Sequence, residues 1–187
     1  MEYSEQIRQF VPSNAQEEAD QRVMLAYLQE YSHNVLLRDN LIAHITSSGF
    51  VMNRARDKVL LVHHNIRDAW AWTGGHADGD GDLLAVARRE AQEETGVDAV
   101  VPLAEAIASL DILAEAGHWR RGIYVNAHLH LSVGYILICD EGAALRPAPG
   151  ENTDVAWFPV AYFTEEHFGA VDAYLYKKLI ARAQRMD

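Results

Sequence analysis

Residues 74–97 read GGHADGDGDLLAVARREAQEETGV, and this stretch carries the clearest structural and chemical signal of the chain. The pattern predicts a helix over residues 82–95, because an Asp stands at its start as a cap and a Gly follows its end as a stop. At about 100° per residue, Glu90, Glu93 and Glu94 fall within an arc of about 100° around this helix. One helix face therefore gathers three carboxylates, while Leu and Ala residues on another side can pack against a sheet.

Three carboxylates on one helix face repel each other by roughly a few tenths of a kcal/mol per pair. A divalent cation converts this repulsion into binding free energy, because Mg²⁺ prefers carboxylate oxygens and fills its other positions with water and substrate phosphate. We expect Arg89, four residues before Glu93, to pair with it and fix its rotamer. Gly74 and Gly75 allow the backbone to approach a ligand closely. A helix face with several Glu residues is usually just solvated, so the flanking pattern decides between the two interpretations.

The stretch resembles the Nudix box, Gly-x5-Glu-x7-Arg-Glu-U-x-Glu-Glu-x-Gly-U, in which U is an apolar residue. The positions that match in register are Gly75, Arg89, Glu90, Ala91, Glu93, Glu94, Gly96 and Val97. The early Glu of the box falls instead on Gly81, between Asp80 and Asp82. In the family this Glu helps to organise the metal site, so in this chain its role is either lost or passed to a neighbouring Asp.

The resemblance to the Nudix hydrolase family (MutT-like) implies an α+β fold, an α/β/α sandwich with a mixed β-sheet. It implies a hydrolase that cleaves the pyrophosphate bond of a nucleoside diphosphate linked to another moiety, with Mg²⁺ as the cofactor and Mn²⁺ as the alternative. By position, Glu90 and Glu94 are the main metal ligands, Glu93 is a further ligand or the base, and Glu93, Glu94 and Arg89 carry catalysis. The family often adds an acidic residue from a later loop, for which the candidates are Asp140, Glu141, Glu151 and Asp154.

The chain around the box predicts mostly strands. Residues 41–52 and 58–63 are apolar runs on either side of a polar turn and predict a hairpin. Residues 69–73 predict a short aromatic strand that ends at the two glycines, and residues 117–122 predict a turn between two long strands. The remaining expected elements are those long strands, a short strand and a closing helix, over residues 106–114, 123–139, 154–158 and 164–183.

A further helix is predicted over residues 13–31, where apolar residues recur at helical spacing. We therefore divide the chain into an N-terminal helical extension, residues 1–38, which lies outside the resemblance, and a Nudix hydrolase domain, residues 39–187. The sequence contains no internal repeat and no low-complexity linker that would mark another boundary.

The 187 residues carry a net charge of −11 and a single cysteine. This acidity argues against binding duplex nucleic acid through a basic face, but a small nucleotide or diphosphate substrate can still bind through bridging cations. No apolar run approaches the roughly 18 residues of a membrane span and no signal-peptide pattern is present, so we expect no membrane partner and a cytoplasmic location. Dimers are frequent in the family, so the resemblance makes a homodimer one assembly to test.

The segment His128-Leu129-His130 places two imidazoles on one face of a strand, where His76 and His118 can join them. Three interpretations of these histidines stay open: metal binding, substrate binding in a polar cleft, and a purely structural role. The candidate substrate-binding residues are Gly74, Gly75, His76, His128, His130, Arg120 and Arg121.

Two alternatives to hydrolysis remain open. A binding module that senses a nucleotide sugar without cleaving it would account for Gly81. Isopentenyl diphosphate isomerase shares the fold and a degenerate box and uses His and Glu around a metal, which the His-rich strand would suit. It also needs a catalytic Cys, however, and Cys139 lies at a predicted strand end away from the box. The sequence does not choose the second moiety of the substrate, because residues 112–115 lack the Pro or Tyr that in the family indicates ADP-ribose or dinucleoside polyphosphates.

Overall fold

Strand β1 (Ala43–Asn53) lies at the centre of the molecule, and every one of its residues is buried. Its alternate side chains enter two separate apolar cores. Ile45 and Val51 belong to the first core, and Phe50 and Met52 belong to the second. A strand that is buried on both faces needs a layer of structure on each side of its sheet.

The computed structural model describes residues 1–120 and 122–186. Around β1 it forms an eight-stranded sheet with the path β10-β2-β1-β9-β5, onto which β3, β4 and β6 pair at β2, β1 and β9. The β1–β9 pair is parallel and the other pairs are antiparallel, so the sheet is mixed. The other strands are β2 (Lys58–His64), β3 (Ala69–Ala71), β4 (Thr73–His76), β5 (Val101–Pro102), β6 (Ser109–Glu115), β9 (His128–Cys139) and β10 (Asn152–Pro159).

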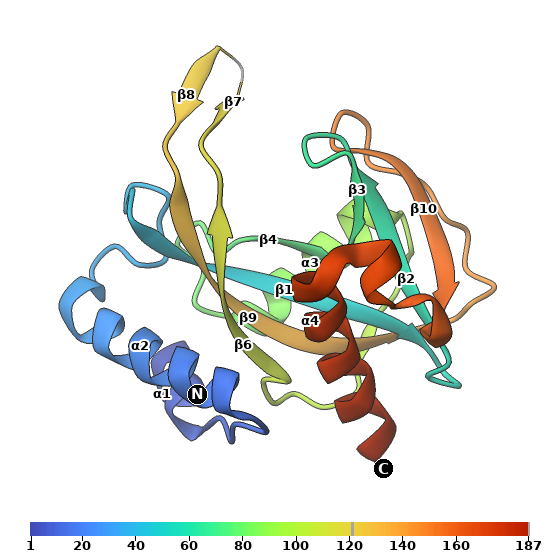
Figure 1. Ribbon diagram of the computed structural model, residues 1–187, viewed down its shortest axis with the longest axis horizontal. Helices are drawn as coiled ribbons and strands as arrows, with labels where there is room; N and C mark the ends of the chain where they lie inside the picture. The colour runs from blue at the N-terminus through green and yellow to red at the C-terminus, as the bar shows by residue number, and fades with distance from the viewer. Residues whose placement is uncertain (121, 187) are drawn as a thin grey trace.

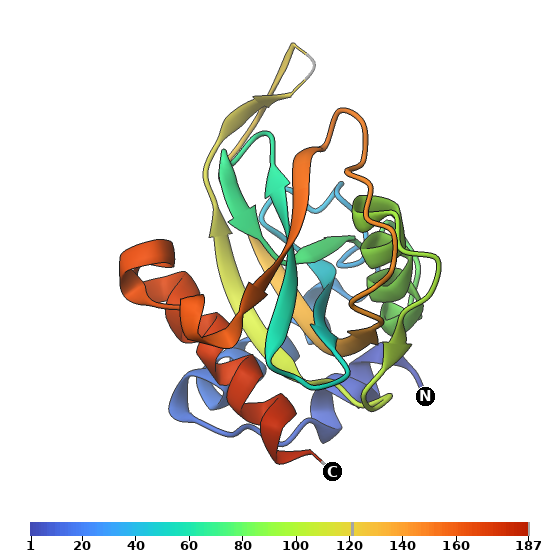
Figure 2. The same ribbon diagram turned by 90° about the vertical axis from the view of Figure 1, so that its right-hand side faces the viewer.

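Helices cover both faces of the sheet, which makes the fold an α/β/α sandwich of the α+β class (Figure 1). Seen from the side, α4 (Glu165–Arg185) lies on one face and α3 (Leu83–Thr95) on the other (Figure 2). Among the described residues, no helix has the length and apolar character required to cross a membrane.

The N-terminal segment forms two helices, α1 (Tyr3–Gln9) and α2 (Ala15–Tyr31), and only the second was expected. Asn14 caps α2, because its side-chain oxygen accepts a hydrogen bond from the backbone N–H of Glu17 at 2.9 Å. Ile7 of α1 and Met24 of α2 are buried in the first core with the side chains of the sheet. The extension is therefore packed into the body of the protein, while its separation as a domain at residue 38 stays a prediction.

The hairpin of β1 and β2 and the helix α3 confirm two of the local expectations. The expected strand over residues 69–73 is wrong in its bounds, because β4 continues through both glycines to His76. These glycines extend the strand by pairing with Ser47 and Ser48 of β1. The backbones meet closely at this point, and glycine is the residue that permits such an approach.

The turn expected over residues 117–122 is also wrong in its bounds. Its first half is strand β7 (His118–Arg120), which pairs with β8 (Ile123–Val125) to form a separate two-stranded ribbon. The ribbon projects beyond the large sheet as a continuation of β6 and β9 (Figure 1). Glycines at both ends of the segment favoured a turn, whereas the chain continues as paired strands beyond the first of them.

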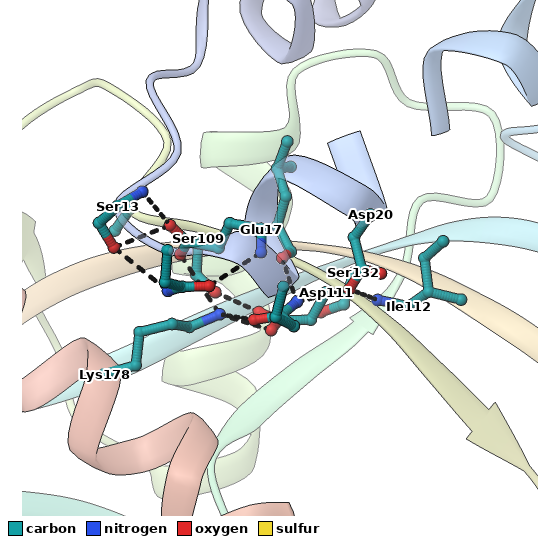
Figure 3. A network of polar contacts seen from close by, with 12 residues as sticks. Ser13, Glu17, Asp20, Ser109, Asp111, Ile112, Ser132 and Lys178 are labelled. Atoms are coloured by element: carbon teal, nitrogen blue, oxygen red, sulfur yellow. Dashed lines mark hydrogen bonds and ion pairs between the residues drawn. The ribbon is translucent and has the colours of Figure 1, made fainter. Parts of the chain in front are cut away.

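A buried ion network joins α2, β6 and α4 where the N-terminal helices meet the sheet (Figure 3). The Lys178 ammonium lies 2.6 Å from Asp111 Oδ1 and 3.3 Å from Glu17 Oε1, and all three side chains are buried. Arg182 Nη2 adds a second contact to Glu17, 2.9 Å from Oε2. Because carboxylates from two different elements share one ammonium, the network fixes α4 against both α2 and β6.

We predict that Lys178→Met lowers the free energy of unfolding by about 3–5 kcal/mol, because it leaves the buried Asp111 carboxylate without its cation and Glu17 with Arg182 alone. Urea unfolding followed by circular dichroism measures the loss. Lys177→Met is the matched control. Lys177 is the exposed neighbour of Lys178, so its substitution should change the free energy of unfolding by about 0.5 kcal/mol or less. Equal stabilities of the two variants would contradict the structural role given to Lys178.

Candidate functional site

Helix α3 is positioned by local signals at both of its ends. The Asp82 side chain accepts a hydrogen bond from the backbone N–H of Ala85 at 3.1 Å, which caps the N-terminus. Gly96 takes the left-handed conformation with φ 71°, and its N–H donates to the carbonyl of Gln92 at 2.9 Å. These caps fix which residues fill the turns of the helix and hence which carboxylates meet the sheet.

Two of the three box glutamates lie directly against strand β4. The backbone N–H of Gly74 donates to Glu94 Oε2 at 3.1 Å. A side chain at Gly75 would overlap the Glu90 carboxylate, so the absence of a Cβ there makes room for that group. Glu93 is exposed at the edge of the same helix. The structure therefore brings Glu90 and Glu94 to two consecutive glycines and leaves Glu93 facing solvent.

Burial and neighbouring negative charge raise the pKa values of Glu90 and Glu94. Burial, with added repulsion from Glu90, Glu151 and Glu93, raises the pKa of Glu94 from its ordinary 4.5 to about 8, although the Gly74 N–H acts in the opposite direction. Burial also raises the pKa of Glu90, against the effect of Arg89. The folded chain thus places more negative charge around Glu90 and Glu94 than its own basic side chains neutralise.

Glu151 is the later-loop candidate that the structure places near the box, because its charge acts on both Glu90 and Glu94. The next residue, Asn152, donates from its side chain to the backbone carbonyl of Glu94 at 3.2 Å, which ties this loop to α3. The other three candidates have local partners. These pairs are Asp140 with the N–H of Gly142, Asp154 with the N–H of Val155, and Glu141 with Lys58 and Asn53.

The expected pairing of Arg89 with Glu93 is wrong. Arg89 Nη2 lies 3.3 Å from Glu90 Oε1, and Nη1 lies 3.7 Å from Asp80 Oδ2. The guanidinium contacts the half-buried Glu90 carboxylate and Asp80 in the loop before the helix, because Glu93 points to solvent. Arg89 therefore bridges the box helix to the loop that carries the missing glutamate position.

This loop contains two aspartates with different local roles. Asp82 is used as the cap of α3, whereas the Asp80 carboxylate faces Arg89 and so lies on the Glu90 side of the loop. Gly81 itself lies beside α1: a Cβ there would be 3.5 Å from the ring of Tyr3, an ordinary contact distance. Of the two neighbours of Gly81, Asp80 is the one directed toward the box carboxylates.

The residues present fit a hard divalent cation. Glu90 and Glu94, with Glu151 nearby, offer only oxygen atoms, which Mg²⁺ and Mn²⁺ prefer to nitrogen or sulfur. A cation between them would also offset the mutual repulsion that adds to the effect of burial on their pKa values.

Histidines gather on the opposite face of β4. His76, His128 and His130 come together as the sequence suggested, but the fourth member is His44 of β1, and each of the four offers a ligand atom within 4.8 Å of the others. His118 does not join this group in the described part of the chain; its Nδ1 lies 3.0 Å from the carbonyl of Ala116. The contribution of His44 was missed because it depends on the pairing of β1 with β9, which no local pattern reveals.

Two of the predicted substrate-binding residues cannot be placed. Arg121 lies outside the described residues, and of Arg120 only the backbone, in β7, is described. Gly74 and Gly75 lie in β4 beside the box carboxylates, and the histidines lie on the other side of that strand.

Comparison with known proteins identifies the family of the chain. The family model of the NUDIX domain matches residues 43–179. No curated protein matches the chain. Similar solved structures include a Nudix-family hydrolase from Clostridium perfringens, at 20% identity and a TM-score of 0.45, covering 71% of this chain and 97% of that one. An Ap4A hydrolase from C. elegans is 16% identical at a TM-score of 0.49, and the match covers 73% of this chain and 95% of that one. A MutT protein from Bacillus halodurans is 19% identical at a TM-score of 0.44, and the match covers 73% of this chain and 81% of that one.

The raised pKa of Glu94 predicts how stability depends on pH when no metal is bound. An unfolded Glu ionises near 4.5 and folded Glu94 near 8, so its contribution is complete below pH 4.5 and is lost as the pH rises through about 8. Between these values the free energy of unfolding of the parent protein, relative to Glu94→Gln, should fall by at most about 1.4 kcal/mol per pH unit.

Urea unfolding in excess chelator at several pH values measures this difference. Glu105→Gln, an exposed change, serves as the control and should follow the parent protein at every pH. If the free energy of unfolding of Glu94→Gln also changes with pH in parallel with that of the parent protein, the pKa of Glu94 is not raised as described.

Proposed function

The chain belongs to the Nudix family, and we propose that it is a divalent-metal-dependent hydrolase that cleaves the pyrophosphate bond of a nucleoside diphosphate linked to another moiety. The observation that best supports this proposal is the placement of Glu90 and Glu94 against Gly74 and Gly75. Buried oxygen donors without enough cations of their own are suited to a metal ion and the phosphates that it bridges.

Glu90 and Glu94 would hold the cation, with Glu93 as a further ligand or as the base. Bound Mg²⁺ supplies neutralisation of phosphate charge and a lowered pKa for a bound water. Arg89 keeps the Glu90 carboxylate in place through its contact at 3.3 Å. The exposed position of Glu93 leaves its carboxylate accessible to a water from solvent, as a general base requires.

In the proposed reaction the oxygen of a water molecule attacks one phosphorus atom of the pyrophosphate, and the bridging P–O bond breaks. The base accepts the proton of the water, and the other phosphate leaves with the bridging oxygen. The products are a nucleoside monophosphate and the phosphorylated second moiety. Gly74 and Gly75 would let the substrate phosphates approach the β4 backbone, and Arg120 and Arg121 stay candidates for contacts to phosphate.

The structure weakens the isomerase alternative. That chemistry needs an accessible catalytic Cys, whereas Cys139 is buried at the end of β9 and its thiol donates to the carbonyl of Asp140 at 3.4 Å. Burial raises the pKa of this thiol, which lowers its reactivity. The formation of product distinguishes our proposal from the non-hydrolytic binding module, because the binding module would form none.

We expect the protein to release nucleoside monophosphate from at least one member of a panel of ADP-ribose, nucleotide sugars, dinucleoside polyphosphates, coenzyme A and oxidised nucleoside triphosphates, in the presence of Mg²⁺ or Mn²⁺. Glu94→Gln should lower kcat by about 10²–10³-fold, since it removes a ligand of the ion that stabilises the transition-state charge. Chromatography of the products measures both results.

Glu105→Gln is the control for this experiment, because it removes an exposed carboxylate that is not part of the box. Its kcat should equal that of the parent protein. Full activity in excess chelator would refute the metal dependence, and binding of a panel member without any product would favour the sensing module.

We further propose that Asp80 takes the role of the glutamate that Gly81 replaces. Asp80→Asn should then raise the Mg²⁺ concentration for half-maximal activity by about tenfold, as for other residues that position metal ligands. Asp82→Asn removes the same charge from the same loop but keeps the helix cap, because Asn caps as well as Asp. If Asp82→Asn shifts the Mg²⁺ titration as much as Asp80→Asn, the two aspartates act only through their charge.

A further inference from the structure

Three strands bring four histidines to one face of the sheet. His44 of β1 pairs in register with His130 of β9, and Thr46 of β1 pairs with His76 of β4. His128 precedes His130 by two residues and so shares its face. The ring centroid of His44 lies 5.0 Å from that of His76, 4.9 Å from that of His128 and 5.3 Å from that of His130. The four imidazoles thus surround a common point.

The spacing of their nitrogen atoms is close to that of a metal ligand set. Four nitrogens bound to Zn²⁺ at about 2.0–2.1 Å lie about 3.3 Å apart in a tetrahedron. His128 Nε2 and His130 Nε2 are already 3.1 Å apart, and all four ligand atoms lie within 4.8 Å of one another. The widest pair would have to close by about 1.5 Å, which rotation of the side chains can supply.

Backbone carbonyls orient two of the rings. His44 Nδ1 lies 3.1 Å from the carbonyl of Asn40, and His128 Nδ1 lies 2.8 Å from that of Asn126. A carbonyl only accepts, so Nδ1 carries the proton in both rings and Nε2 of the neutral ring keeps its lone pair. This carbonyl-to-Nδ1 arrangement is the one that orients histidine ligands in metal sites.

The strongest sign of a missing partner is at His44. The residue is 5% exposed, and its Nε2 has no hydrogen-bond partner among the residues that the structure describes. A buried polar atom without a partner costs roughly 1–3 kcal/mol, so such atoms are rare unless something binds them. This nitrogen belongs to the four ligand atoms that lie together.

The charges around the group are paired with each other. The Arg38 guanidinium, which acts on His44 and His76, binds Asp78 at 2.6 and 2.7 Å. Glu115, which acts on His130, is bound by Arg67 at 2.6 Å.

The surroundings of His44, His76 and His130 disfavour the charged imidazole. Burial, with smaller effects from neighbouring positive groups, lowers the pKa of His76 to about 3 and that of His130 to about 4. Burial also lowers the pKa of His44. These imidazoles are therefore neutral at physiological pH, and neutral imidazole is the metal ligand.

We propose that His44, His76, His128 and His130 bind a transition-metal ion of the Zn²⁺ class at a site separate from the box carboxylates. Imidazole nitrogens favour Zn²⁺, Cu²⁺, Ni²⁺ or Fe²⁺, whereas Mg²⁺ favours oxygen. Gly75 and His76 are consecutive in β4 and point to opposite faces of the sheet, so the two sites cannot share one ion.

An ion bound by all four imidazoles would join β1, β4 and β9 at one point. Zn²⁺ with four protein ligands is the arrangement of a structural site, because no position is left for water or substrate. Here it would hold the end of β4, the strand whose two glycines lie against Glu90 and Glu94. The site would thus stabilise the fold without taking part in bond cleavage.

The test uses the full chain stripped of metal and then titrated with Zn²⁺ against a chromophoric chelator, in excess Mg²⁺. The parent protein should take up one equivalent of Zn²⁺, and X-ray absorption should show imidazole nitrogen at about 2.0–2.1 Å. His128→Gln and His130→Gln, in half-buried positions, should each weaken binding by about 100-fold or more. Zn²⁺ should raise the Tm of the parent protein and leave that of both variants unchanged.

Two matched variants separate this site from other sources of binding. Glu94→Gln should keep full affinity for Zn²⁺, and so should His33→Gln, which removes an exposed histidine outside the group. The spectrum of the parent protein with Co²⁺ gives the ligand geometry without any substitution. The proposal is overturned if the parent protein binds no stoichiometric Zn²⁺, if absorption shows oxygen ligands, or if Glu94→Gln or His33→Gln loses Zn²⁺ as His130→Gln does.

Discussion

The parallel pairing of β1 with β9 is the constraint on which the rest of the structure depends. It runs through all of β1, from Ala43 beside Leu129 to Asn53 beside Cys139. A parallel pair requires a long crossover between its strands, and here that crossover contains β4, α3 and the whole box. Since β4 pairs on β1 in turn, the position of the box relative to the sheet follows from this one pairing.

The protein treats buried carboxylates in two opposite ways. Glu17 and Asp111 are buried with Lys178 and Arg182, so the chain supplies the cations that their burial requires. For Glu94, the described residues provide a backbone N–H and further carboxylates but no basic side chain within ion-pair distance. The buried carboxylates of the ion network are neutralised by side chains of the protein. The arrangement around Glu94 lacks such a side chain, so a bound cation would have to neutralise it. This contrast separates the structural acids of the molecule from the acids of its candidate site.

Features that depend on neighbouring residues in the sequence could be predicted, and features that depend on distant pairing could not. The box helix, its caps and the first hairpin follow from local spacing and turn residues. Glu151 could not be ranked among the later-loop acids, because its approach to the box is set by the loop before β10. His44 gave no signal, since only the register of β1 with β9 places it beside His130. The partner of Arg89 was misjudged because helical spacing ignores the loop that carries Asp80.

Strand β4 connects the two groups of candidate ligands through two adjacent residues. Gly75 makes room for the Glu90 carboxylate on one face, and His76 joins the imidazoles on the other. The alternation of a strand thereby sorts oxygen donors from nitrogen donors, and the two sets prefer different metals. Because the backbone of β4 is common to both, a displacement of His76 would also move the glycine that faces Glu90. The placement of Gly75 against Glu90 and that of His76 among the imidazoles therefore depend on the same strand.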